Sequence, residues 1–246
     1  MRISAALPLA LALLASPAVA EVAAEIEHLP QPAGLGRLVR PDGRADSPLV
    51  VVLPDALGED GRSEQYVDSL LARGIATLVL GLGEDLDSRP AALDPSAAPQ
   101  AIAPVLAWAE EAGFPPGRTG ILGFGLGGRA ALLGSAGLPA AAIYPGCTGL
   151  SLPAHGPALV LQGDASAAGC DALPSRPGLS LHLVKGAGHG WDVPGAIWPS
   201  PGPLLPDPAG GERLRAVNDL HATLEAVEAV SAWFAEQLQA LSAAAR

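Results

Sequence analysis

The chain has 246 residues, of which 49% are hydrophobic and 16% charged, and its formal net charge at neutral pH is −11. So acidic a chain would be repelled by phosphates, which excludes nucleic acid as an expected partner. The hydrophobic content is sufficient for one domain with a large core, without a structural metal or many disulfides.

The N-terminus has the pattern of a secretory signal peptide. Met1-Arg2 is a short positive start, residues 3–14 are apolar, and small residues precede a cleavage point after Ala20. The apolar stretch is too short to span a bilayer, which makes a permanent anchor the weaker interpretation. We predict a signal peptide over residues 1–20, a single domain over 21–246, a periplasmic or secreted location, and no membrane association once the leader is removed.

From residue 48 onward, short apolar runs alternate with helical patterns, which is typical of an α/β fold with a mostly parallel sheet. The predicted strands are residues 49–53, 75–80, 119–122, 140–144, 158–161 and 179–184. The predicted helices are residues 63–73, 97–112, 130–136 and 212–241. In the last helix, a stripe predicted to cover the sheet consists of Leu214, Val217, Leu220, Leu224, Val227 and Trp233.

Three other stretches have a less regular pattern. Residues 22–47 are predicted to add one or two edge strands, and residues 81–96 form a polar loop. Residues 186–211 are dense in proline and glycine, and within them Pro194 to Pro208 is either a lid over a pocket or a surface crossover.

Residues 119–129 read T-G-I-L-G-F-G-L-G-G-R, a strand that runs into a glycine-rich turn and a helix. Gly123, Gly125 and Gly128 satisfy G-x-G-x-x-G, which in dinucleotide-binding proteins brings a pyrophosphate to a helix N-terminus. That site also needs an acidic residue about twenty positions further on, and no Asp or Glu occurs between Gly128 and Asp164. A dinucleotide-binding protein is therefore a minor alternative.

The same residues also fit a nucleophile elbow, G-x-Nu-x-G, in which a sharp turn lifts the nucleophile above the sheet. Gly125 then occupies the nucleophile position and cannot act as a nucleophile. A third interpretation is a plain strand-to-helix turn whose glycines serve only close packing.

Several separated segments resemble, in the same order, the dienelactone hydrolase family of α/β-hydrolases. They are the acidic turn Pro54-Asp55-Ala56-Leu57-Gly58, the elbow from Gly123 to Gly128, Tyr144-Pro145-Gly146, the strand from Pro157 to Gly163, and Gly186-Ala-Gly-His-Gly-Trp191. Together these matches span roughly residues 48 to 240. The resemblance implies the α/β-hydrolase fold, with helices on both faces of the sheet, and ester or lactone hydrolysis without a cofactor.

The catalytic residues carry over only in part. By the resemblance, His189 falls on the catalytic base, Gly125 on the nucleophile and Ser166 on the acid, so two of the three positions are substituted. Asp164 and Asp171 lie nearby in the sequence and could orient His189 instead, although loop carboxylates are usually just solvated.

Backbone donors of an oxyanion hole survive such substitutions. The N–H of Leu126 and one from the Asp55-Ala56 turn are expected to face the same place. Trp191 either lines the same pocket or packs in the core. Our leading hypothesis is a catalytically weak or small-molecule-binding protein whose ligand is an ester, a lactone or a carboxylate. The alternative is an active ester or lactone hydrolase in which His189 activates water and Asp55 assists.

Cys147 and Cys170 are the two cysteines of a chain that we predict to be exported, which favours a disulfide over two buried free thiols. The histidines are scattered, without paired spacing or a carboxylate cluster, so we predict no metal site. Nothing in the sequence indicates an oligomeric state.

Overall fold

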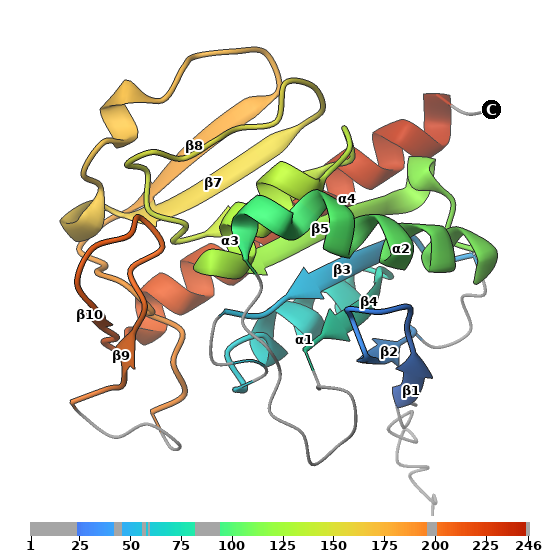
Figure 1. Ribbon diagram of the computed structural model, residues 1–246, viewed down its shortest axis with the longest axis horizontal. Coiled ribbons are helices and arrows are strands. Elements are labelled where there is room, and N and C mark those ends of the chain that lie inside the picture. The colour runs from blue at the N-terminus through green and yellow to red at the C-terminus, as the bar shows by residue number, and fades with distance from the viewer. Residues whose placement is uncertain are drawn as a thin grey trace, which may run out of the picture.

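The computed structural model describes residues 24–41, 46–55, 58, 60–81, 94–195 and 201–244. Within these ranges, eight strands form one sheet in the order β1-β2-β4-β3-β5-β6-β7-β8 (Figure 1). The predicted signal peptide lies outside the described residues and stays a prediction.

The strands are β1 (Ala24–His28), β2 (Leu35–Val39), β3 (Leu49–Leu53), β4 (Ala76–Leu80), β5 (Thr119–Phe124), β6 (Ala140–Ile143), β7 (Ala158–Gly163) and β8 (Leu179–Val184). From β4 to β8 every neighbouring pair is parallel, whereas β1 and β2 add an antiparallel edge. The strands β3 and β4 are buried along their whole length, which explains why they read as continuous apolar runs. The predicted sheet and its N-terminal edge strands are confirmed.

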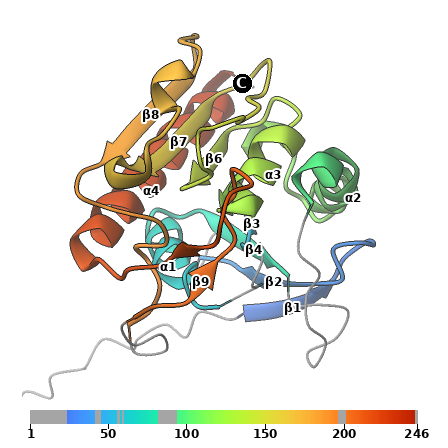
Figure 2. The ribbon, with the colours of Figure 1, turned by 60° about the vertical axis from the view of Figure 1, so that its left-hand side comes forward.

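Helices cover both faces of this sheet, as predicted (Figure 2). The helices are α1 (Glu64–Ala72), α2 (Ala98–Glu111), α3 (Leu126–Gly134) and α4 (Leu220–Ala244), with short 3-10 turns η1 (Pro95–Ala97), η2 (Pro116–Arg118), η3 (Asp164–Ser166) and η4 (Cys170–Ala172). Buried side chains of α1 and α4 share one core cluster, and those of α2 and the middle of α3 share another. No helix in the described part of the chain is long and apolar enough to cross a membrane.

The prediction for the last helix was wrong in its start and only partly right in its buried face. Leu214 lies in a strand, β10 (Leu214–Arg215), which pairs with β9 (Leu204–Leu205), and the helix begins only at Leu220. Its start is capped by Asp219, whose carboxylate accepts the N–H of Ala222 at 3.0 Å.

Of the predicted stripe, Val227 and Trp233 pack against the core, whereas three residues nearer the start of the helix are exposed. Val217, Leu220 and Leu224 are 60%, 63% and 55% exposed. The face that contacts the sheet consists of Ala222, Ala226, Val230, Phe234 and Leu238. Small residues let the helix approach closely, and a Cβ at Gly120 of β5 would lie 2.7 Å from the Phe234 ring. The helix α4 therefore buries the face that lets its backbone lie close to the sheet.

The described part of the proline-rich crossover packs beside the histidine loop. Leu205 and Ala216 form a small apolar cluster with Val193, and Ala216 makes a parallel bridge with His189. This contact brings the β9–β10 hairpin against the loop that carries the predicted catalytic base, the place where a lid would lie. The interpretation of this segment as a lid stays a prediction.

Candidate active site

The elbow is built at the junction of β5 and α3. Gly125 has φ +52° and ψ −117°, a conformation that side chains rarely adopt, and α3 begins directly after it rather than at residue 130 as predicted. A Cβ at Gly123 would lie 2.1 Å from the carbonyl oxygen of Gly127, and one at Gly127 would lie 2.2 Å from that of Pro54. Glycines weaken the helical pattern, so the early start of α3 depends on this tertiary packing.

The space above Gly125 is filled by the carboxylate of Asp55, which follows β3. A Cβ on Gly125 would lie 2.6 Å from Oδ1 and 2.8 Å from Oδ2 of Asp55. The backbone N–H of Leu126 donates to Oδ1 at 3.3 Å. The carboxylate therefore stands where the side chain of an elbow nucleophile would begin, and it uses the predicted oxyanion-hole donor.

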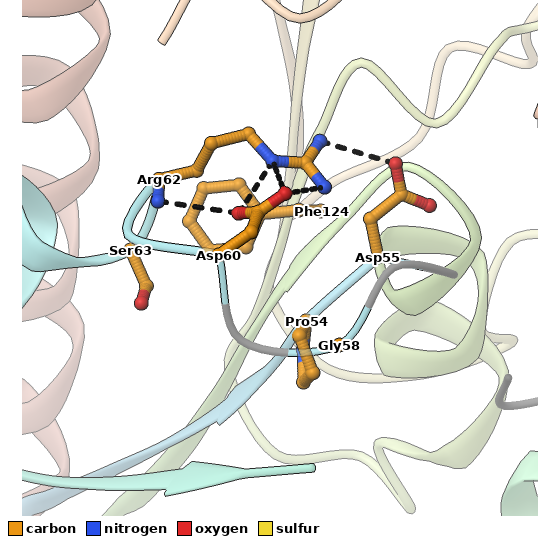
Figure 3. Close-up of a pocket in the computed structure, with 7 residues that line it drawn as sticks. All are labelled: Pro54, Asp55, Gly58, Asp60, Arg62, Ser63 and Phe124. Carbon is orange, nitrogen blue, oxygen red and sulfur yellow. Dashed lines mark hydrogen bonds and ion pairs between the residues drawn. The ribbon is translucent and has the colours of Figure 1, made fainter. Parts of the chain in front are cut away.

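Arg62 holds this carboxylate from the other side (Figure 3). Its Nη1 donates to Asp55 Oδ2 at 3.1 Å, and its Nε approaches both oxygens of Asp60, at 2.9 and 2.8 Å. The Arg62 side chain is only 2% exposed and that of Asp55 is fully buried. Two carboxylates sharing one guanidinium form a buried, charge-assisted cluster whose geometry is strongly constrained.

Beside this cluster lies a cavity of about 10 Å³. Its walls are Pro54, Asp55, Gly58, Asp60, Arg62, Ser63 and Phe124 (Figure 3). A cavity of this size has room for about one water molecule. Ala56, the other predicted ligand contact on this turn, lies outside the described residues.

Tyr144 connects the elbow to a second buried carboxylate. Its hydroxyl accepts from Arg62 at 3.3 Å and donates to Asp192 Oδ1 at 2.7 Å, while Tyr66 donates to Asp192 Oδ2 at 3.0 Å. Burial raises the pKa of Asp192 to about 6, although the Arg62 charge and both tyrosine hydrogen bonds act against this rise. Tyr144 has a φ of +39°, unusual for a residue with a side chain, and such strain is often found at functional sites.

His189 stands against the ring of Tyr144, with the two ring centroids 4.8 Å apart. Its Nε2 is buried and has no hydrogen-bond partner among the described residues. Burial lowers the pKa of His189 to about 4; the charges of Asp55 and Asp207 raise it and that of Arg62 lowers it. The imidazole is therefore neutral at pH 7 and can accept a proton.

The residues considered as the acid have other contacts. Ser166 accepts a hydrogen bond from Gln162 at 2.8 Å and donates to the Gly163 carbonyl at 3.2 Å. Asp164 accepts the N–H of Gly186 at 2.7 Å, so it shapes its own loop. Asp171 is exposed. The charges of Asp55 and Asp207 raise the pKa of His189, against the larger effect of burial.

Trp191 is fully buried, and its ring packs edge-on against Tyr144 with centroids 4.9 Å apart. This position favours the packing interpretation, and a ligand contact by Trp191 stays a prediction.

Two clamps order the loop after β6. Cys147 and Cys170 form the predicted disulfide, with their Cα atoms 4.8 Å apart. Arg129 of α3 donates to the carbonyl oxygens of Pro145, Gly146, Thr148 and Gly149, at 2.7, 2.8, 2.7 and 3.2 Å. The loop that follows Tyr144 is thereby fixed to the elbow helix.

Neither a protein-family model nor a curated protein matches the sequence. Solved structures do match. A dienelactone hydrolase-like promiscuous phosphotriesterase from metagenomic libraries has a TM-score of 0.60 at 17% identity, covering 88% of this chain and 98% of its own. The dienelactone hydrolase of Anabaena variabilis has a TM-score of 0.56 at 18% identity, covering 86% and 97%. The carboxyl esterase 2 of Tuber melanosporum has a TM-score of 0.57 at 15% identity, covering 89% and 88%.

The chain has the α/β-hydrolase fold. The fold implied by the resemblance is confirmed, and proteins that share it include dienelactone hydrolases; at these identities the likeness concerns the fold alone. Within this fold, a series of contacts connects Gly125 with His189. Asp55 lies over Gly125 and pairs with Arg62, whose Nη1 also donates to the Tyr144 hydroxyl. The Tyr144 ring packs against His189. The geometry neither requires nor tests a dinucleotide, although the Asp55 charge at the start of α3 would oppose a pyrophosphate.

Sequence reasoning missed Arg62, Tyr66, Asp192 and Asp207. Asp192 follows the Gly-His-Gly-Trp segment directly, which is the one signal that could have indicated it. Arg62 lies in a polar stretch before α1, where a charged residue is expected in solvent. Only its contacts with Asp55 and Tyr144, 7 and 82 positions away along the chain, explain its burial.

Proposed function

We propose that the chain is an exported, dienelactone hydrolase-like protein that binds a small ester, lactone or carboxylate and hydrolyses acyl substrates weakly at most. The observation that supports this proposal is the Asp55 carboxylate above Gly125, where an acyl-transfer nucleophile would stand. Loss of the nucleophile costs about 10⁶ in turnover, whereas binding and the oxyanion hole retain roughly 10³ to 10⁴ over water.

Binding remains possible because the donor at the start of α3 still holds a carboxylate, that of Asp55. A ligand carbonyl or carboxylate that displaced Asp55 would receive the same Leu126 N–H. Arg62 would not be left as an isolated buried charge, because Asp60 pairs with it as well. Asp55 thus marks the position and the chemistry of the ligand group.

The decisive experiment restores the nucleophile. Gly125→Ser alone places its Cβ against the Asp55 carboxylate, so we expect little activity from it. In Gly125→Ser/Asp55→Ala, the space and the donor are free. We expect this double variant to hydrolyse p-nitrophenyl acetate at least about 100-fold faster than either single variant and to react with a fluorophosphonate.

His189→Ala in the double-variant background is the control and should abolish the gain, since the new serine needs a base. If the folded double variant neither reacts with the fluorophosphonate nor hydrolyses the ester, the elbow is not a usable ligand site and the proposal is wrong.

A second candidate is hydrolysis by a water that His189 activates. It is favoured by the partnerless Nε2 of His189 and by a pKa of about 4, which leaves the base neutral above that pH. Wild-type ester or lactone hydrolysis that His189→Ala reduces by about 100-fold or more would establish it, with activity lost only as the pH falls toward 4. Equal rates in wild type and His189→Ala would exclude it.

The export part of the proposal rests on the predicted leader and agrees with the disulfide, which persists outside the reducing cytoplasm. Sequencing the N-terminus of the protein purified from its native cells tests it, with Glu21 as the expected first residue.

A further inference from the structure

The structure places a carboxylate, a backbone donor and a proton acceptor around the vacant elbow. Asp55 Oδ1 faces the Leu126 N–H, and Oδ2 is oriented by Arg62, which Asp60 also holds. The imidazole of His189, whose Nε2 is buried and partnerless in the described part of the chain, packs against the ring of Tyr144. The Tyr144 hydroxyl in turn accepts a hydrogen bond from the same Arg62 Nη1 that donates to Asp55. A carboxylate can form covalent intermediates when a base stands by to hydrolyse them.

We propose that Asp55 is a carboxylate nucleophile for small alkyl halides. Its Oδ2 acts as the nucleophile that Gly125, without a side chain, does not provide. This activity goes beyond the proposed function, which concerns acyl ligands. The proposal also accounts for the combination of Gly125 with Asp55, because any side chain at residue 125 would displace the Asp55 carboxylate from its place above the turn.

In the first step, Oδ2 attacks the carbon that bears the halogen. A carbon–oxygen bond forms, the carbon–halogen bond breaks, and the halide leaves with the electron pair. The product is an alkyl ester of Asp55. Esterification removes one negative charge from a buried cluster of two carboxylates and one guanidinium, and Arg62 keeps its pairing with Asp60.

In the second step, His189 Nε2 takes a proton from water, and the resulting hydroxide adds to Cγ of Asp55. Negative charge then develops on Oδ1, which the Leu126 N–H already faces at 3.3 Å. The bond from Cγ to the alkylated oxygen breaks, and His189 returns its proton to the departing alcohol. The acid left at Asp55 loses its proton to solvent. The alcohol carries the original Oδ2, and the oxygen of the water remains in Asp55.

The same geometry disfavours acyl substrates for this nucleophile. An ester carbonyl would need the Leu126 N–H, which Asp55 already occupies, and carboxylate attack on it would give a reactive anhydride. An alkyl halide has no carbonyl and needs no such donor.

The test uses 1-bromopropane with the folded protein in oxygen-18 water. We expect bromide release and, after turnover, oxygen-18 in the peptide that contains Asp55. In His189→Phe, turnover should fall by about 100-fold or more, because ester hydrolysis loses its base. Intact-mass measurement should then show one propyl group per chain, located on Asp55.

Asp55→Asn removes the nucleophile and should abolish bromide release and alkylation, whereas Asp68→Asn, which changes an exposed carboxylate on α1, should behave as wild type. The proposal is overturned if the wild type releases no bromide, if Asp55→Asn retains the activity, or if oxygen-18 does not enter Asp55. The oxygen-18 measurement needs no variant and therefore does not depend on how Asp55→Asn folds. The acyl test of the proposed function removes Asp55, so the two proposals can fail independently.

Discussion

The two sides of the site stabilise their buried carboxylates in different ways. On the elbow side, at the ends of β3 and β5, Asp55 and Asp60 share the Arg62 guanidinium in direct ion pairs. On the histidine side, after β8, Asp192 is held by two neutral tyrosine hydroxyls. His189 Nε2 has no hydrogen-bond partner there among the described residues.

The difference separates two kinds of constraint. Ion pairs on the elbow side fix the position of a carboxylate. On the histidine side burial dominates, moving the pKa of His189 down to about 4 and that of Asp192 up to about 6. The elbow side therefore constrains geometry, the histidine side contains the shifted pKa values of His189 and Asp192, and Tyr144 contacts both sides.

The largest expected effect comes from breaking the elbow side at its cation. Arg62→Met leaves Asp55 and Asp60 buried beside each other without their guanidinium, and we expect a loss of about 3 to 5 kcal/mol in the free energy of unfolding. Urea denaturation measures this loss. Adding Asp55→Asn to Arg62→Met should recover part of it, because one uncompensated charge is removed. A loss of under about 1 kcal/mol would show that the cluster does not constrain this side.

The next effect concerns how the stability contributions of His189 and Asp192 depend on pH. Because the pKa of His189 is lowered from 6.5 to about 4, the folded state binds fewer protons between these values, and acidification destabilises it. Because the pKa of Asp192 is raised from 3.8 to about 6, its stabilising contribution is full below 3.8 and is lost as the pH rises through 6. Each effect amounts to about 3 kcal/mol, and in the wild type the two oppose each other.

Single variants of Asp192 and His189 should reveal the contribution of each residue to the pH dependence of stability. Relative to wild type, Asp192→Asn should lose about 3 kcal/mol of stability between pH 7 and pH 4, and His189→Phe should gain a similar amount. Urea denaturation between pH 7 and pH 4 measures the free energy of unfolding of both variants. Subtracting the wild-type value at each pH removes the contributions of the other carboxylates, which are common to all three proteins. Variant curves parallel to that of the wild type would contradict the assignment.

A smaller effect tests the contact between Gly125 and Asp55. Gly125→Ala adds a Cβ at φ +52° and against the carboxylate, for an expected loss of roughly 2 kcal/mol. In a double-mutant cycle with Asp55→Ala, at least about 1 kcal/mol of that loss should disappear, leaving the backbone strain. Additive losses would mean that the two residues are not in contact.

The smallest effect lies at the start of α4, beside the histidine loop. Asp219 caps the helix with its side chain, and its N–H donates to the Trp191 carbonyl at 2.8 Å. Asp219→Ala should cost about 1 kcal/mol, and Asp219→Asn, which can still cap, about half as much or less. Thermal unfolding measures both, and equal losses would exclude capping as the cause.

The candidate site was predictable where its chemistry follows local pattern. Glycines at fixed spacing between a strand and a helix indicated the elbow, and a histidine between glycines indicated His189. Cys147 and Cys170 were predicted as a pair because they are the two cysteines of a chain that we predict to be exported, and they are bonded. Asp192 and Arg62 could not be assigned in this way, because a charged residue in the sequence is expected in solvent until its buried partners are known.

By itself, the amino-acid sequence determined the parallel sheet with its helices and the glycine-rich turn at Gly125, since periodicity and glycine spacing act over a few residues. Only the tertiary structure decided which carboxylate lies over Gly125, which face of α4 is buried and how far burial lowers the pKa of His189. These depend on contacts between distant segments, such as Leu126 with Asp55 across 71 positions, and on desolvation, which exists only once the core has closed.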